Sequence, residues 1–153
     1  MSSISDAIQA KCLAFGDRII KLNDFLLAKA AEDHERYKKD QKQRKFGQKT
    51  SSILHQPSSI PVHLQAVSNL CNQLLRAGTS IGANNAEAIS AISKADFKSK
   101  SYIALKEARE SLYWLELLHR NNYLDDVQYQ SLFTDCDELV RVLTHRCKKL
   151  AVN

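Results

Sequence analysis

Apolar side chains recur along the first part of the chain at alternating steps of four and three, which is the spacing of one face of an α-helix. Serine and aspartate precede the first of them, and such residues favour the start of a helix and the positive end of its dipole. The pattern predicts a helix over about residues 6–31 that buries this stripe. The stripe consists of Ile8, Cys12, Phe15, Ile19, Leu22 and Leu26.

The stripe stops after Ala31, although no helix-breaking residue occurs before Gly47. The stretch between them, EDHERYKKDQKQRKF, is dense in charges of both signs. It can extend the first helix to about residue 45 as a solvated arm, or it can stay mobile. Residues 47–61, GQKTSSILHQPSSIP, contain serines and both prolines, which is the composition of a linker. We therefore treat residues 32–61 as an insertion after the first helix.

Three further stripes predict helices over about residues 62–91, 94–120 and 126–150. Ser93 and Asp96 form a capping-box pattern before the second of these helices. Asp125, within the turn NNYLDD at residues 121–126, is the expected cap of the last helix. Helices joined by short turns pack antiparallel, so we expect a single all-α domain over residues 1–153, an up-down-up-down four-helix bundle. The three stripes are Val67, Leu70, Leu74, Ala77, Ile81, Asn84 and Ala88; Phe97, Ser101, Ala104, Ala108, Leu112, Leu115 and Leu118; and Leu132, Cys136, Leu139, Leu143, Cys147 and Leu150.

Two glycines, Gly78 and Gly82, interrupt the helix predicted over residues 62–91. Each costs a helix interior ~1 kcal/mol relative to alanine. The facing stripe of the next predicted helix also carries small residues, so close packing of these two helices can offset the cost. The alternative is that one glycine merely kinks the helix. We expect the close packing, with Ser101, Ala104 and Ala108 opposite the glycines.

Composition narrows the class of protein further. Of the 153 residues, 44% are apolar and 25% are charged, as in ordinary soluble domains, and the net charge is +5. A mild basic excess permits a polyanionic partner without requiring one. No apolar run has the length of a membrane span and no signal-peptide pattern occurs, so we expect a cytoplasmic protein. The four cysteines lack C-x-x-C spacing and are expected to be buried, reduced thiols.

Catalytic and metal-binding patterns are almost absent. A di-metal site in a bundle needs two Glu-x-x-His motifs and two further glutamates, whereas this chain has one such motif, Glu116 to His119. The GTSIG segment lies in a predicted helix and lacks the lysine of a phosphate-binding loop. Glu107 and Glu110 lie one turn apart beside basic residues, which indicates ion pairing. We expect no enzymatic activity, no metal and no cofactor.

Three segments together resemble the four-helix-bundle family of 23S rRNA intervening-sequence proteins and the related accessory proteins of diversity-generating retroelements. The segments are LLRAGTSIGANNAEA, SKADF and IALKEARESLYWLELL, at residues 74–88, 93–97 and 103–118. The resemblance implies a homo-oligomer, typically a pentameric ring, without catalytic activity. The retroelement members imply a basic scaffold for nucleic acid and a reverse transcriptase. Two features depart from the family pattern, which usually has an apolar residue at Asn85 and a shorter connection after the first helix.

The resemblance also carries a set of positions that we expect at an oligomer interface or in a polar network between helices. Five polar members could pair across that interface, since a charge buried there must be paired. The two aromatic members lie off the core stripe and have the composition typical of interfaces. An intramolecular role at the edge of the core is the alternative for both. The set is Arg76, Asn84, Glu87, Glu107, Glu110, Tyr113 and Trp114.

In an up-down-up-down bundle the start of the third helix and the end of the fourth lie at the same end of the domain. Basic residues gather there, and those at the helix start oppose the dipole, so a helix-capping role does not explain them. We expect salt-sensitive binding of RNA or DNA at this end. The alternative is an oligomeric scaffold for a protein partner with no nucleic-acid role. The expected basic set is Lys94, Lys98, Lys100, Arg141, Arg146, Lys148 and Lys149.

Overall fold

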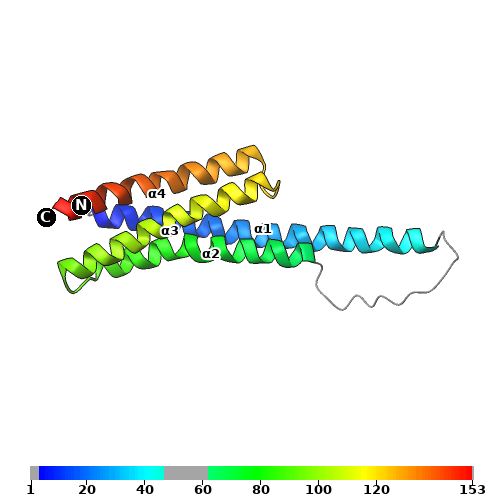
Figure 1. Ribbon diagram of the computed structural model, residues 1–153, viewed down its shortest axis with the longest axis horizontal. Coiled ribbons are helices and arrows are strands. Elements are labelled where there is room, and N and C mark those ends of the chain that lie inside the picture. Colours follow the sequence, from blue (N-terminus) through cyan, green and yellow to red (C-terminus); the bar gives the residue numbers. More distant parts are fainter. Residues whose placement is uncertain (1–3, 47–61, 153) are drawn as a thin grey trace.

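The fold is an antiparallel bundle of four helices, as the sequence predicts (Figure 1). The computed structural model describes residues 4–46 and 62–152, and the linker predicted at residues 47–61 lies outside the described residues. Each helix packs against its neighbours in sequence, and α4 closes the bundle against α1. Both chain ends lie at one end of the bundle in Figure 1. The helices are α1 (Ile4–Phe46), α2 (Val62–Ile89), α3 (Lys94–Arg120) and α4 (Asp126–Val152).

The first helix is much longer than its apolar stripe. Of the two alternatives for the charged segment after Ala31, the structure shows the helical one, since α1 continues to Phe46. At ~1.5 Å per residue, its 43 residues span roughly 64 Å, against roughly 40 Å for the 27 residues of α3. The surplus projects past the other helices in Figure 1, and most side chains over residues 31–43 are exposed. We call residues 31–46 the arm.

Local capping explains where α3 and α4 begin. The Ser93 hydroxyl accepts a hydrogen bond from the Asp96 backbone N–H at 3.1 Å, which confirms the predicted cap. The Asp96 carboxylate accepts in turn from the Ile92 backbone N–H at 3.2 Å, one residue earlier than in a standard capping box. At α4, the Asp125 carboxylate accepts from the Gln128 N–H at 2.7 Å. These bonds satisfy backbone donors that a helix start leaves without partners.

The predicted stripes form the core, with one shift of register in α2. Most stripe residues are buried, including all four cysteines, which are free thiols as expected. Asn84, placed on the buried stripe by the sequence pattern, is only half-buried. Its neighbour Asn85 is the fully buried residue, with 0% exposure. The adjacent positions differ by about 100° around a helix, so periodicity alone did not separate them.

The glycines of α2 permit close packing, but against a different helix from the one predicted. A Cβ added to Gly78 would lie 3.0 Å from a side-chain carbon of Ile19, and one added to Gly82 would lie 3.4 Å from the Cβ of Cys12. Both contacts belong to α1, so the expected glycine contact with α3 is wrong. The small residues of α3 are buried as well, and α2 is one unbroken helix. The glycines thus bring α1 close to α2.

Long polar side chains make the connection between α1 and α4. The Arg18 guanidinium forms an ion pair with Asp135 and donates to the Ser131 hydroxyl at 2.9 Å. About two turns from the start of α1, Lys11 lies 3.0 Å from Glu138. These ion pairs add to the core packing of α1 and α4, which is less extensive than the packing of the other neighbouring helices. None of the helices within the described residues has the length and apolar character needed to cross a membrane.

Candidate functional site

The start of α3 and the end of α4 lie together at the end of the bundle that holds both chain ends. The Phe97 ring of α3 lies 5.5 Å from the guanidinium of Arg146 in α4. One turn along α3, the Tyr102 hydroxyl donates to the Cys147 carbonyl at 3.4 Å. These two contacts bring the basic residues of both helices to one end, which we call the basic end.

Four lysines give the basic end its exposed charge. Lys94 and Lys98 stand on the first turns of α3, and Lys148 and Lys149 on the last turns of α4, and all four are exposed. Lys94, Lys98 and Lys148 form no ion pair within residues 4–46 and 62–152. Cations at the N-terminus of α3 oppose its dipole, so helix stability does not explain Lys94 and Lys98.

Two other predicted members of the basic set are engaged in ion pairs. Lys100 pairs with Glu87 across α3 and α2, and this pairing raises the pKa of the lysine. Arg141 lies 3.1 Å from Asp137, one turn earlier on α4. A polyanion would have to compete with these carboxylates, so Lys100 and Arg141 contribute less to an anion-binding surface than Lys94, Lys98 and Lys148.

Arg146 differs from the rest of the set because its side chain points into the bundle. Its Nη1 donates to the Asn85 side-chain oxygen at 2.6 Å, and the Asn85 amide donates to the Gln9 side chain at 2.6 Å. Burial lowers the pKa of Arg146 from its ordinary value. These hydrogen bonds link α1, α2 and α4 in one polar network. Sequence reasoning missed it because a long side chain at a helix end gives no sign of its direction.

The second predicted set, on α2 and α3, divides into separate pairs within one chain. The Asn84 amide donates to the Ser80 carbonyl of its own helix at 2.9 Å, and Trp114 donates to Glu110 at 3.0 Å. Glu87 forms the pair with Lys100 described above. The structure therefore places Asn84, Glu110 and Glu87 in three different contacts, not in a common network.

Glu107 is the member of this set with a perturbed carboxyl group. Partial burial raises its pKa, the nearby Glu110 charge raises it further, and Arg76 partly opposes both. Arg76 is exposed on α2. Burial and a like charge both destabilise the ionised carboxylate. A cation placed nearby would stabilise it.

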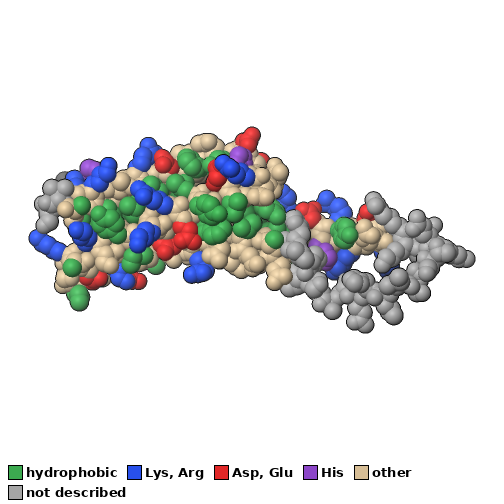
Figure 2. All heavy atoms as spheres, viewed as in Figure 1, with side chains coloured by type: hydrophobic (Ala, Val, Ile, Leu, Met, Phe, Trp, Pro, Cys, Tyr) green, Lys and Arg blue, Asp and Glu red, His purple; other side chains and the backbone are tan. Residues whose placement is uncertain are grey.

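The aromatic pair lies beside these charges. The Tyr113 and Trp114 rings pack edge to face with centroids 4.9 Å apart, and Tyr113 remains 59% exposed. Trp114 is half-buried and packs against the core. Figure 2 shows hydrophobic side chains gathered over the C-terminal half of α3, with acidic and basic side chains toward the α2–α3 turn. Exposed aromatic area next to charges is typical of interface surfaces.

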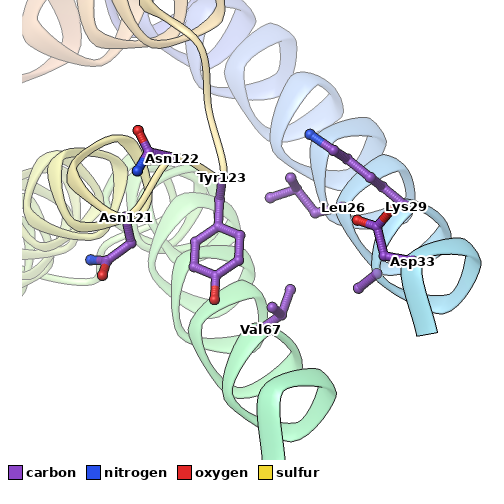
Figure 3. A pocket seen from close by; sticks show the side chains of 8 residues that line it. Leu26, Lys29, Asp33, Val67, Asn121, Asn122 and Tyr123 are labelled. Carbon is purple, nitrogen blue, oxygen red and sulfur yellow. The ribbon is translucent and has the colours of Figure 1, made fainter. Parts of the chain in front are cut away.

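A small pocket of about 220 Å³ lies where the arm leaves the bundle (Figure 3). Leu26 and Val67 come from α1 and α2, and Tyr123 reaches between them from the α3–α4 turn. Asn122 in this turn has φ 61°, a left-handed conformation that asparagine tolerates better than most residues. The sequence pattern identified this segment as a turn but gave no sign of the pocket.

The lone Glu-x-x-His motif connects α3 to α4. Glu116 accepts from the Tyr129 hydroxyl at 2.5 Å and from Arg120 at 2.6 Å. His119 stacks on the Tyr129 ring at 4.2 Å and lies 2.8 Å from Asp126. Burial and the Glu116 contact raise the pKa of Tyr129 to about 12. Within the part of the chain that the structure describes, no cluster of His, Cys, Asp or Glu could hold a metal ion.

Comparison with known proteins identifies a family and solved structures similar to this chain. Residues 58–145 match the model of the 23S rRNA-intervening sequence protein family. A crystal structure of a protein of unknown function from the S23 ribosomal protein family of Bacteroides thetaiotaomicron is 35% identical. The match covers 94% of this chain and 97% of that one, with a TM-score of 0.66. No curated protein sequence matches the chain.

Proposed function

The chain belongs to the 23S rRNA-intervening sequence protein family, and on that premise we propose that it is a non-catalytic, homo-oligomeric accessory protein that binds RNA or DNA through its basic end. The names of the family and of the family of the similar structure both connect these relatives with the ribosome or its RNA. Binding would depend on charge and be largely independent of sequence, because the surface offers lysines and no base-reading element.

The observation that carries the proposal is the group formed by Lys94, Lys98, Lys148 and Lys149 at one end of the bundle. The α3 pair opposes its own helix dipole, which costs stability unless an anion compensates it. Each lysine that neutralises a phosphate releases a counterion, so four such contacts give a clear salt dependence. Repetition of the basic end in an oligomer would convert weak contacts into avidity.

A protein-scaffold function is the second candidate, and the α3 surface favours it. Tyr113 presents an aromatic ring that is more than half exposed, and its ring partner Trp114 donates to Glu110, whose charge acts on Glu107. Such a surface suits a second copy of the chain or another protein better than a polynucleotide. In this alternative the oligomer forms, but the basic end has no nucleic-acid partner.

A salt titration of binding separates the two candidates. Fluorescence anisotropy with a structured RNA, a duplex DNA and a single strand, starting at ~50 mM salt, measures affinity and its salt slope. The variant with Lys94, Lys98, Lys148 and Lys149 all changed to Glu is expected to bind weakly. Its slope of log affinity against log salt should fall by about 3 to 4, at ~0.9 per lost phosphate contact.

The matched control changes four exposed lysines elsewhere, Lys21, Lys39, Lys42 and Lys106, to Glu. Both variants carry the same net charge, so the difference between them reports position, not total charge. If the wild-type protein binds no nucleic acid at ~50 mM salt, or if both variants lose binding equally, the basic end is not the site. The scaffold function then takes its place.

A further inference from the structure

A groove of about 560 Å³ runs between the first turns of α1 and the last turns of α4. At the glycines α1 packs closely against α2, whereas its packing against α4 is less extensive. A site of this volume falls in the ~300–1,000 Å³ range of small-molecule pockets. In Figure 2, hydrophobic and basic side chains gather at the end of the molecule that holds this groove.

The walls of the groove combine apolar surface with positive charge. Its apolar side chains are Ile4, Ala7, Ile8 and Val142, contributed by both helices. Among its lining residues, every ionisable side chain is basic and none is a carboxylate. These basic residues are Lys11, Arg141, His145, Arg146 and Lys149.

Arg146 is the residue that most strongly favours an anionic ligand in the groove. One guanidinium nitrogen, Nη1, is held by Asn85, and the Phe97 ring lies 5.5 Å from the guanidinium. The other nitrogen, Nη2, is buried and has no hydrogen-bond partner among the described residues. The nearby Cys12 thiol cannot neutralise the charge, because burial raises its pKa to about 11. A partly buried guanidinium without a counter-charge loses hydration that no ion pair offsets.

Two other basic residues of the groove differ from Arg146 because they have acidic partners. Lys11 pairs with Glu138, and Arg141 pairs with Asp137, so each already has an acidic partner. Arg146 lines the same groove, and no carboxylate among the described residues compensates its charge. Neither a polynucleotide nor a simple inorganic anion uses the apolar walls of this groove, whereas a hydrocarbon chain does.

We propose that this groove binds a small anionic amphiphile, a carboxylate on a linear hydrocarbon chain. The carboxylate compensates the charge of Arg146, with Lys11 and Lys149 at the rim, and the chain lies along Ile8 and Val142. The proposal goes beyond nucleic-acid binding and does not depend on it. A groove of this type favours a ligand that supplies both a charge and an apolar surface over one that supplies either alone.

The test is calorimetric titration of the full chain with dodecanoate below its micelle concentration. We expect saturable binding at one site per chain. Dodecanol, which lacks the charge, and dodecyltrimethylammonium, which reverses it, should bind at least about tenfold more weakly, or ~1.4 kcal/mol. Failure of dodecanoate to bind below about 1 mM, or equal affinity for the three probes, overturns the proposal.

Two variants at exposed positions of α1 locate the ligand without threatening the fold. Ala7 lines the groove, whereas Ala10 does not, and both are exposed alanines of the same helix. Ala7→Glu should weaken dodecanoate binding at least about tenfold by occupying the groove with a carboxylate, whereas Ala10→Glu should stay within about twofold. Equal effects of the two variants overturn the proposed location.

A third variant separates this site from the nucleic-acid surface. Lys94 and Lys98 do not line the groove, so the double change to Glu should weaken polynucleotide binding and leave dodecanoate binding unchanged. Loss of dodecanoate binding in that variant places the amphiphile on the general basic surface and overturns the groove. Unchanged polynucleotide binding with intact dodecanoate binding counts against the proposed function alone.

Discussion

At the scale of single residues, the three glycines on the described helices should respond very differently to alanine. A Cβ at Gly78 would lie 3.0 Å from Ile19, closer than comfortable packing allows, whereas nothing lies within 4 Å of one at Gly16. Gly16→Ala should therefore stabilise the fold by about 0.5–1 kcal/mol through helix propensity. In Gly78→Ala, overpacking of about 1–3 kcal/mol should outweigh that gain.

Urea unfolding of the two variants beside the wild type measures this difference. Gly82→Ala is an intermediate case, because its added carbon would make an ordinary contact at 3.4 Å with Cys12. It should resemble Gly16→Ala more than Gly78→Ala. Equal stability of Gly78→Ala and Gly16→Ala would show that α1 and α2 have room to separate, contrary to the close packing described here.

Asn85 and Asn84 form a second matched pair at the residue scale. Asn85 is fully buried and holds both Arg146 and Gln9, so its change to alanine leaves a buried guanidinium without its partner. We expect Asn85→Ala to destabilise the fold by about 2–3 kcal/mol. Asn84 contacts only the Ser80 carbonyl of its own helix, and Asn84→Ala should change stability by less than about 0.5 kcal/mol.

Thermal and urea unfolding of both asparagine variants provide the measurement. Arg146→Met in the Asn85→Ala background should recover part of the loss, because it removes the stranded charge. If Asn84→Ala proves the more damaging variant, the buried position of α2 is the one that periodicity indicated. Additive losses for Asn85 and Arg146 would show that the two side chains do not act as one unit.

These residues show where sequence reasoning reaches its limit. Periodicity identifies the buried face of a helix, but not which neighbour covers it, so the glycines were predicted as small-residue contacts and assigned to the wrong helix. A step of one residue moves a side chain by about 100°, which is enough to exchange Asn84 and Asn85. The direction of Arg146 depends on Asn85 and Phe97, which are distant in sequence and meet only in the fold.

At the scale of elements, the caps were predictable because they are local. Ser93 and Asp96 are three residues apart, as are Asp125 and Gln128, so their hydrogen bonds depend on few other parts of the chain. The helical state of the arm was left open for the opposite reason. Its charged residues allow a helix without a buried face, and propensity alone does not decide between helix and coil.

The arm itself should be dispensable for folding. Over residues 31–43 it buries almost no side chain, so its removal takes little burial energy from the bundle. Replacement of residues 32–58 by a short flexible linker should leave the melting temperature within about 5 °C of the wild type. Circular dichroism melts of the two proteins make the comparison. An insoluble product, or a fall well beyond that range, would assign the arm a structural role.

At the scale of the whole molecule, the proposed oligomer requires an interface between copies of the chain. The surface of α3 carries the half-buried Trp114 and the exposed Tyr113, and it also carries Glu107, whose pKa is raised within the isolated chain. An interface would bury the tyrosine and could pair the glutamate with a cation of a second copy. In the proposed oligomer this surface would form the contact between copies, whereas within one chain its residues make only separate local contacts.

Tyr113→Glu tests that placement with a close internal control. Tyr113 is 59% exposed and Tyr37 on the arm is 61% exposed, so the same change at either position affects the isolated fold little. Light scattering at micromolar concentration should give the wild type a mass several times the 17.3 kDa of the chain, five times if a pentameric ring forms. Tyr113→Glu should reduce that mass, because it buries an unpaired charge at the interface, whereas Tyr37→Glu should not.

A wild-type mass of one chain contradicts the oligomer itself. An unchanged mass for Tyr113→Glu moves the interface away from α3 and leaves the exposed tyrosine to a protein of another kind.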